Sequence, residues 1–174
     1  MHLLERDRDA GKLLSKSLLL TLESVGHCNQ CRIFSEKEIC SICSNKKRDA
    51  NTICLVETVS DVFAIEESNQ YLGKYFILHG CLSPIDNIGP NEIGLDQLFQ
   101  LVKDNHIHEI ILATNSTLEG EATAHFVYDS LKEMKSLKIT RLARGVPLGG
   151  ELEYVDGGTI MHALSGRVNL KPDK

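Results

Sequence analysis

Four cysteines near the start of the chain have the type and spacing of metal ligands. They follow the pattern C-x2-C-x8-C-x2-C and are Cys28, Cys31, Cys40 and Cys43. Each C-x2-C pair turns two thiolates towards one point, and two pairs complete a tetrahedron around Zn²⁺. Because all four ligands are protein thiolates, no coordination position stays open, and the spacing predicts one structural zinc ion per chain. The alternatives are two local disulfides, which are typical of oxidising compartments, or free thiols.

Three basic residues follow the last cysteine closely. They are Lys46, Lys47 and Arg48. Cationic side chains at one place can contact the phosphates of DNA. The alternative is an ordinary solvated turn, and the sequence leaves both interpretations open.

Carboxylates lie where two predicted strands end. Glu57 ends the β-rich run 52–57, and Glu119 and Glu121 follow the run 109–113. Carboxyl ends of parallel strands meet at one edge of a sheet, where ligands gather. Clustered carboxylates there would suit Mg²⁺ and phosphoryl chemistry. The alternative is that Glu119 and Glu121 stabilise the start of a helix.

Composition limits the kinds of partner. The 174 residues carry a net charge of −5, so DNA binding would need a local basic patch or a partner protein. No tryptophan is present and aromatic residues make up 5%, which argues against an aromatic platform for single strands. No apolar run is long enough to span a membrane and no signal peptide is evident, so the expected compartment is the cytoplasm.

The remaining sequence predicts the elements that must position these side chains. Strand-like runs at 52–57, 75–79, 109–113 and 138–143 alternate with helical periodicity, which predicts an α/β fold with a parallel sheet and flanking helices. Leucines at helical spacing predict a helix over 2–24 before the cysteines. The predicted parts are a helical segment, a four-cysteine zinc knuckle, an α/β domain and a carboxyl-terminal segment, at 1–26, 27–44, 52–147 and 148–174.

Longer motifs resemble known families. The segment 115–122, Asn-Ser-Thr-Leu-Glu-Gly-Glu-Ala, resembles the Asp-x-Asp-x-Glu-Gly-Glu-Ala segment of Toprim domains in type IA topoisomerases, and Glu57 resembles their strand-end glutamate. Two aspartates of that pattern fall on Asn115 and Thr117, which argues against catalysis. Together with the cysteines, the segments 82–90 and 143–156 give the chain a resemblance to the bacterial recombination mediator family RecR from about residue 1 to 167.

The resemblance implies a non-enzymatic role in recombinational DNA repair. It implies action with RecO and RecF, independent of RecBC, to help load the RecA recombinase onto gapped single-stranded DNA. It also implies a homo-oligomer, dimer or tetramer, with contacts from 148–174, and a cytoplasmic protein that joins the nucleoid during repair. The Toprim face that would meet a partner, DNA or Mg²⁺ includes the side chains Glu57, Asn115, Glu119 and Glu121.

One feature of the family is missing from the sequence. RecR proteins normally open with a helix-hairpin-helix that contains a Gly-x-Gly-Pro-Lys-like turn, and no such turn precedes Cys28. Residues 1–26 are therefore interpreted as a remnant of that region, and two explanations stay open: the start is assigned late, or the element is lost. Two other functions stay open: a Mg²⁺-dependent Toprim phosphotransferase or nuclease, and a zinc-stabilised interaction module without DNA contact.

Overall fold

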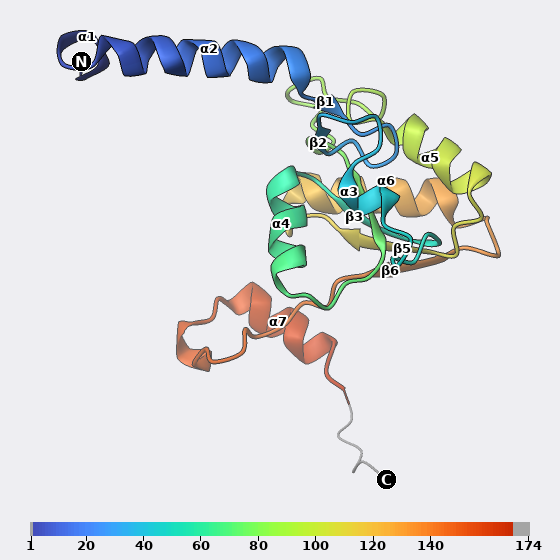
Figure 1. The fold of residues 1–174 in the computed structure, drawn as a ribbon. Helices are drawn as coiled ribbons and strands as arrows, with labels where there is room; N and C mark the ends of the chain where they lie inside the picture. The colour runs from blue at the N-terminus through green and yellow to red at the C-terminus, as the bar shows by residue number, and fades with distance from the viewer. Residues whose placement is uncertain (1, 169–174) are drawn as a thin grey trace. The chain divides into compact units, whose positions relative to one another are not determined.

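The computed structural model describes residues 2–168 (Figure 1). The chain divides into two compact units, Met1–Thr140 and Arg141–Lys174. Nearly all the predicted chemistry lies in the first unit. None of the helices among the described residues is long and apolar enough to cross a membrane.

A four-stranded sheet forms the centre of the first unit, with the order β4-β3-β5-β6. Strand β3 pairs in parallel with β4 on one side and with β5 on the other, so the predicted parallel sheet is confirmed. In this register Leu55 lies opposite both Phe76 and Leu112. The strand bounds are β3 Thr52–Val56, β4 Lys74–Ile77, β5 Glu109–Ala113 and β6 Lys138–Arg141.

Helices cover both faces of this sheet. They are α4 (Val59–Glu67), α5 (Leu95–Asp104) and α6 (Leu118–Leu131). Successive strand residues point to opposite faces, so Ile53 and Leu55 of β3 pack with side chains of α5 and α6. Cys54 and Val56, between and after them, pack instead with α4 and the four zinc-ligand cysteines. The knuckle therefore shares a hydrophobic core with one face of the sheet.

Side-chain caps set where two of these helices begin. Thr58 accepts a hydrogen bond from the backbone N–H of Asp61, whose carboxylate bonds back to Thr58, so α4 starts with a capping box. Thr117 accepts from the N–H of Gly120 and caps α6. This cap sets the start of α6 at Leu118, and the helix ends at Leu131.

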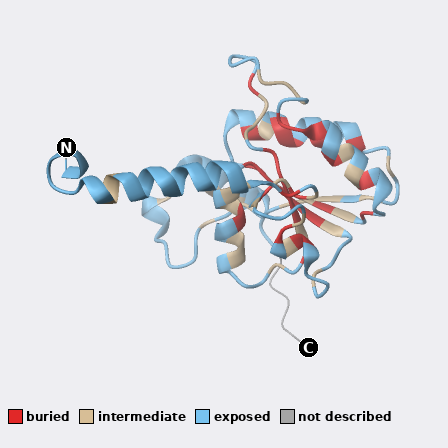
Figure 2. Ribbon diagram, turned by 45° about the horizontal axis from the view of Figure 1, so that its top comes forward, coloured by how far each residue is buried: buried red, intermediate tan, exposed pale blue. Residues whose placement is uncertain are grey.

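The amino-terminal helix is broken once. A short helix α1, His2–Glu5, precedes the longer α2, Arg8–Ser24. The break has a local cause, because the Asp7 carboxylate accepts from the N–H of Ala10 and caps a new helix. Neither helix has a buried residue, and Figure 2 shows α2 exposed along its length apart from one half-buried turn.

A small hairpin and one helical turn follow α2. Strands β1 (Gly26–His27) and β2 (Phe34–Ser35) pair antiparallel, and α3 spans Ser41–Ser44. These elements carry the four cysteines. They lie close to β4 through contacts described below.

The second unit holds a 3₁₀ turn, η1 (Leu152–Tyr154), and one helix, α7 (Gly157–Ser165). The Asp156 carboxylate caps α7 by accepting from the N–H of Thr159. Neither element has a buried residue. The predicted segment 148–174 extends past residue 168, so its end lies outside the described residues.

Candidate metal centre and carboxylate edge

The four predicted zinc ligands converge on one point. The sulfurs of Cys28, Cys31, Cys40 and Cys43 all lie within 4.8 Å of one another, and all four residues are buried. The Sγ atoms of Cys31 and Cys40 are 3.6 Å apart. A tetrahedral zinc ion with Zn–S bonds of about 2.3 Å would place its sulfurs about 3.8 Å apart, so the cluster has the right size.

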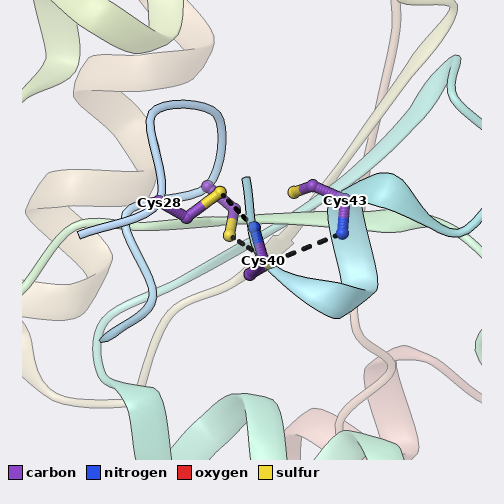
Figure 3. A group of neighbouring side chains, drawn as sticks. Cys28, Cys40 and Cys43 are labelled. Carbon is purple, nitrogen blue, oxygen red and sulfur yellow. Dashed lines mark hydrogen bonds between the residues drawn. The ribbon is translucent and has the colours of Figure 1, made fainter. Parts of the chain in front are cut away.

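Backbone amides orient two of the thiolates. The N–H of Cys40 donates to Sγ of Cys28 at 3.3 Å, and the N–H of Cys43 donates to Sγ of Cys40 at 3.4 Å (Figure 3). Cys40 is also the residue that caps α3, so the third ligand starts the turn that carries the fourth. The amide donors offset part of the negative charge that a four-thiolate site carries.

The pKa values of the thiols are shifted by their closeness to one another, which is why a cation at this cluster is favourable. A hydrogen bond from Cys43, opposed by burial, lowers the pKa of Cys31 to about 6. Burial raises the pKa of Cys40 to about 11, and the hydrogen bond to Cys31 raises the pKa of Cys43 far above its usual value. Burial and the neighbouring thiols therefore oppose the ionisation of Cys40 and Cys43. The soft, closed and buried donor set fits Zn²⁺, which would supply the balancing charge in a structural role.

The first zinc loop is fastened to the sheet at the end of β4. The carbonyl of Cys31 accepts from the N–H of Ile77 at 3.0 Å. The next residue, Arg32, points its Nη1 at the carbonyls of Ile77, Leu78 and Ile93, at 3.1, 3.4 and 2.5 Å. One guanidinium therefore joins the knuckle, the end of β4 and the loop just before α5.

The surroundings of Arg32 are shaped around it. Its guanidinium carbon lies 5.6 Å from the centre of the Phe76 ring, within reach of a cation–π contact. Gly94 has a φ of +77°, and a Cβ at this position would overlap Nη1 of Arg32. Burial lowers the pKa of Arg32 from its usual value. The position needs both a long cation at 32 and a glycine at 94.

At the carboxyl edge of the sheet, the side chain of Glu57 meets Asn115. The carboxylate of Glu57 is buried and accepts from the backbone N–H of Asn115 at 2.9 Å and from its Nδ2 at 2.6 Å. These bonds tie the end of β3 to the loop after β5. Gly120 packs on the pair, because a Cβ there would lie 2.7 Å from Oε1 of Glu57.

The other two predicted carboxylates do not complete a metal site. Among residues 2–168, the four cysteines are the group of three or more His, Cys, Asp or Glu side chains that converges enough to hold an ion. Glu119 is exposed and Glu121 is half-buried on the first turn of α6. Burial, followed by Glu57 and Glu119, raises the pKa of Cys81, so this edge has an acidic character. Mg²⁺ at this edge stays a prediction.

The basic triplet after the zinc ligands is split by the fold. Arg48 forms an ion pair with Glu66 and donates to the carbonyl of Gly73 at 3.0 Å. Its guanidinium is thereby engaged inside the protein, and a DNA contact of Arg48 stays a prediction. Lys46 and Lys47 are exposed and stay candidates for phosphate contact.

Sequence patterns missed three features of this site. They are the contacts of Arg32 with the carbonyls, the pairing of Glu57 with Asn115, and a cluster of exposed rings at His27, Phe34 and His79. The only local sequence signal for any of these features is Arg32, an arginine directly after a C-x2-C pair. The other contacts join residues far apart in the sequence, so they depend on the strand register.

Three family models match consecutive parts of the chain. The RecR zinc finger domain, of the four-cysteine type, matches residues 25–45, and the Toprim domain matches residues 51–143. The RecR carboxyl-terminal model matches residues 145–168. The zinc finger model covers all four cysteines, and the Toprim model covers both Glu57 and Asn115.

Curated relatives match almost the whole chain. A protein named Recombination protein RecR from Saccharophagus degradans is 52% identical over 170 residues, which cover 98% of this chain and 86% of the relative. Proteins of the same name from Methylococcus capsulatus and Xanthomonas campestris are each 51% identical, over 167 and 166 residues. These two alignments cover 96% and 95% of this chain and 84% of each relative. The chain therefore belongs to the RecR family and carries its zinc finger, Toprim and carboxyl-terminal regions in that order.

Proposed function

We propose that this protein is a non-enzymatic mediator of recombinational DNA repair. In this role it acts with RecO and RecF proteins, independently of RecBC, to help load RecA onto gapped single-stranded DNA. Support comes from the relatives named Recombination protein RecR and from the three family models. The proposed partners are DNA, RecO and RecF, and further copies of the same chain.

The observation that carries the non-enzymatic part is the pairing of Glu57 with Asn115. Phosphoryl chemistry at a Toprim edge needs carboxylates to hold hard cations. Here the buried glutamate is hydrogen-bonded by an amide, and Thr117 serves as a helix cap. Asn115 and Thr117, at the two positions where the Toprim pattern has aspartates, are neutral and stabilise the fold. The acidic edge suits a basic surface on a partner protein better than the phosphates of DNA.

The alternative of a zinc-stabilised module without DNA contact is favoured by one observation, the net charge of −5. Binding to a gapped DNA across a range of salt concentrations separates the two functions. Direct phosphate contacts give a slope of log K against log salt of several units, whereas a module without DNA contact gives a slope near zero. The same preparation tests the enzyme: Mg²⁺-dependent nicking that is lost in Glu57→Gln would contradict the mediator role.

Two exposed lysines are the first variants to measure. We expect the double charge reversal Lys46→Glu and Lys47→Glu to weaken DNA binding and to flatten the salt slope by about two units, about one for each lost phosphate contact. The matched control reverses two exposed lysines outside the finger, Lys103→Glu and Lys135→Glu, which change net charge equally. If both pairs weaken binding alike, the effect is one of overall charge and the finger is not the DNA contact.

A further inference from the structure

Three aromatic rings gather on the surface of the zinc finger where it meets the end of β4. The ring centres of His27 and Phe34 are 5.0 Å apart, those of His27 and His79 are 5.0 Å apart, and those of Phe34 and His79 are 5.8 Å apart. All three residues are exposed, and Phe34 keeps 57% of its surface accessible. We call His27, Phe34 and His79 the ring cluster.

The backbone holds the ring cluster from two sides. His27 and Phe34 are paired across the hairpin of β1 and β2, so their positions are fixed by the strand register. Nε2 of His79 donates to the carbonyl of Arg32 at 2.7 Å, and Arg32 is itself anchored to the carbonyls at the end of β4. The third ring is therefore fixed to the same loop that carries two zinc ligands.

Two strained residues lie at the ring cluster, and one of them, His79, belongs to it. Arg32 has a φ of 68° and His79 a φ of 59°, in the left-handed region that residues with a Cβ seldom adopt. Such conformations persist where the surrounding structure fixes them, and they cluster at functional sites. At His79 the strain holds a ring at the surface, next to two others. The rings lie outside the nearby core, which contains Ile33 and Ile77.

The size of the ring cluster points to a small planar ligand. A fully buried aromatic side chain contributes about 150–250 Å², so three partly exposed rings offer on the order of 300 Å². A stable protein interface needs about 800 Å² from each partner. One unpaired nucleobase, in contrast, is matched by one or two rings, and base stacking on aromatic side chains tolerates any sequence.

We infer that the ring cluster is a stacking site for an unpaired base of single-stranded DNA. This inference rests on the proposed role on gapped DNA and adds a contact that does not depend on charge. It departs from the expectation drawn from the low aromatic content, because two of the three rings are histidines. Exposed Lys46 and Lys47, which follow the last zinc ligand, are the proposed phosphate contacts, and the ring cluster is the proposed contact for the base. The ring cluster would let an acidic protein distinguish single-stranded from duplex DNA, because bases in a duplex already stack on their neighbours.

The first experiment uses a fluorescent oligothymidine, the same strand with abasic positions, and a duplex of equal length. Loss of one stacked base costs about 1–3 kcal/mol, so Phe34→Ala should weaken binding of the oligothymidine roughly 5- to 150-fold. It should leave the salt slope and the binding of the abasic strand unchanged. The matched control is Phe63→Ala, because Phe63 is 59% exposed on α4 and lies outside the ring cluster. Zinc content and thermal stability, measured for both variants, confirm that the finger is intact.

A second variant keeps the ring and reports on its contacts. The chain has no tryptophan, so Phe34→Trp adds a single indole whose fluorescence a stacked base would quench. We expect quenching by oligothymidine and none by the abasic strand. No quenching, together with unchanged binding in Phe34→Ala, would overturn the stacking site while the lysine variants could still support DNA binding.

Two further outcomes would also overturn the inference. Absence of any DNA binding by the unmodified protein would remove both the stacking site and the proposed DNA contact. A loss confined to protein partners or to oligomer mass would assign the ring cluster to a protein interface instead.

Discussion

Asn115 stands where the Toprim pattern of type IA topoisomerases has an aspartate, and this single difference changes what Glu57 can do. An aspartate would add negative charge beside the glutamate, and a cation would be needed between them. The amide of Asn115 instead donates a hydrogen bond to the carboxylate. The carboxylate of Glu57 is thus satisfied by a donor group of the protein itself.

Asn115→Asp tests this account. It places a second carboxylate against buried Glu57, and we expect a loss of about 1–3 kcal/mol in the free energy of unfolding at pH 7 without Mg²⁺. Two facing carboxylates raise the pKa of one of them in the folded state. Because that folded pKa lies above the unfolded value, the lost stability should return as the pH falls. Urea unfolding at pH 7 and pH 5, with and without Mg²⁺, measures both effects.

Ser116→Asp is the matched control for this variant, since it adds the same charge to the same exposed loop. Its free energy of unfolding should be close to that of the unmodified protein at both pH values. Equal stability of Asn115→Asp and the unmodified protein at pH 7 would show that the amide does not neutralise Glu57. Stabilisation of Asn115→Asp by Mg²⁺, absent in the control, would show that one substitution is enough to restore a cation site.

At the scale of elements, one side chain makes several of the polar contacts between the zinc finger and the sheet. Arg32 lies in the finger, yet its guanidinium bonds to carbonyls at the end of β4 and before α5. A partly buried arginine that satisfies several carbonyls leaves unpaired acceptors behind when it is removed. The finger should therefore influence the order of the segment 78–94, which includes the loop at the acidic edge.

Arg32→Ala should destabilise the first unit by about 1–3 kcal/mol, because it leaves buried carbonyls without a donor. We expect faster amide hydrogen exchange in residues 78–94 than in β5, which lies on the other side of β3 from β4. Removal of zinc with a chelator should speed exchange in the same segment of the unmodified protein. Hydrogen exchange by mass spectrometry resolves both segments.

Lys37→Ala is the control for Arg32→Ala, since Lys37 is an exposed cation of the same finger. Arg32→Lys keeps the charge but loses the planar guanidinium. Its exchange rate over 78–94 should therefore lie between the rates of Arg32→Ala and Lys37→Ala. Unchanged exchange over 78–94 in Arg32→Ala would show that the finger and the edge are independent.

The elements also show what a single sequence can and cannot predict. The apolar runs predict the four strands within two residues of their ends, because buried parallel strands are short apolar segments bounded by polar residues. Spacing alone predicts the zinc ligands, since both pairs are local. The break at Asp7 and the start of α6 escape the sequence patterns, because each depends on one capping side chain. Arg32 and Ile93 are 61 positions apart, and only the folded register brings them together.

At the scale of the molecule, large apolar side chains remain exposed. Six leucines of α2 are between 49% and 80% exposed, and so are Met161 and Leu164 of α7, at 58% and 62%. Monomeric proteins seldom leave such surfaces open. The proposed homo-oligomer would give these side chains a partner.

The protein should therefore have a mass in solution well above the 19.3 kDa of one chain. Burying apolar surface between copies is the physical reason. Sedimentation at several concentrations measures the mass. Leu18→Glu with Leu22→Glu should shift it towards a monomer, while Ser15→Glu with Ser17→Glu on the same helix should not. A monomer in the unmodified protein across these concentrations would contradict the proposed assembly.

The order of strands in the sheet also determines the order of events during synthesis. The finger and β3 leave the ribosome early, but β3 is a central strand and its neighbour β5 comes much later. Glu57 and its partner Asn115 are separated by 58 positions, which take about 3–12 s to translate at roughly 5–20 residues per second. During that interval β4 can pair with β3 and accept the finger, while the opposite edge of β3 has no partner. A nascent chain is thus most exposed to misassembly between the two halves of its own sheet, and the finger is synthesised before the domain can close.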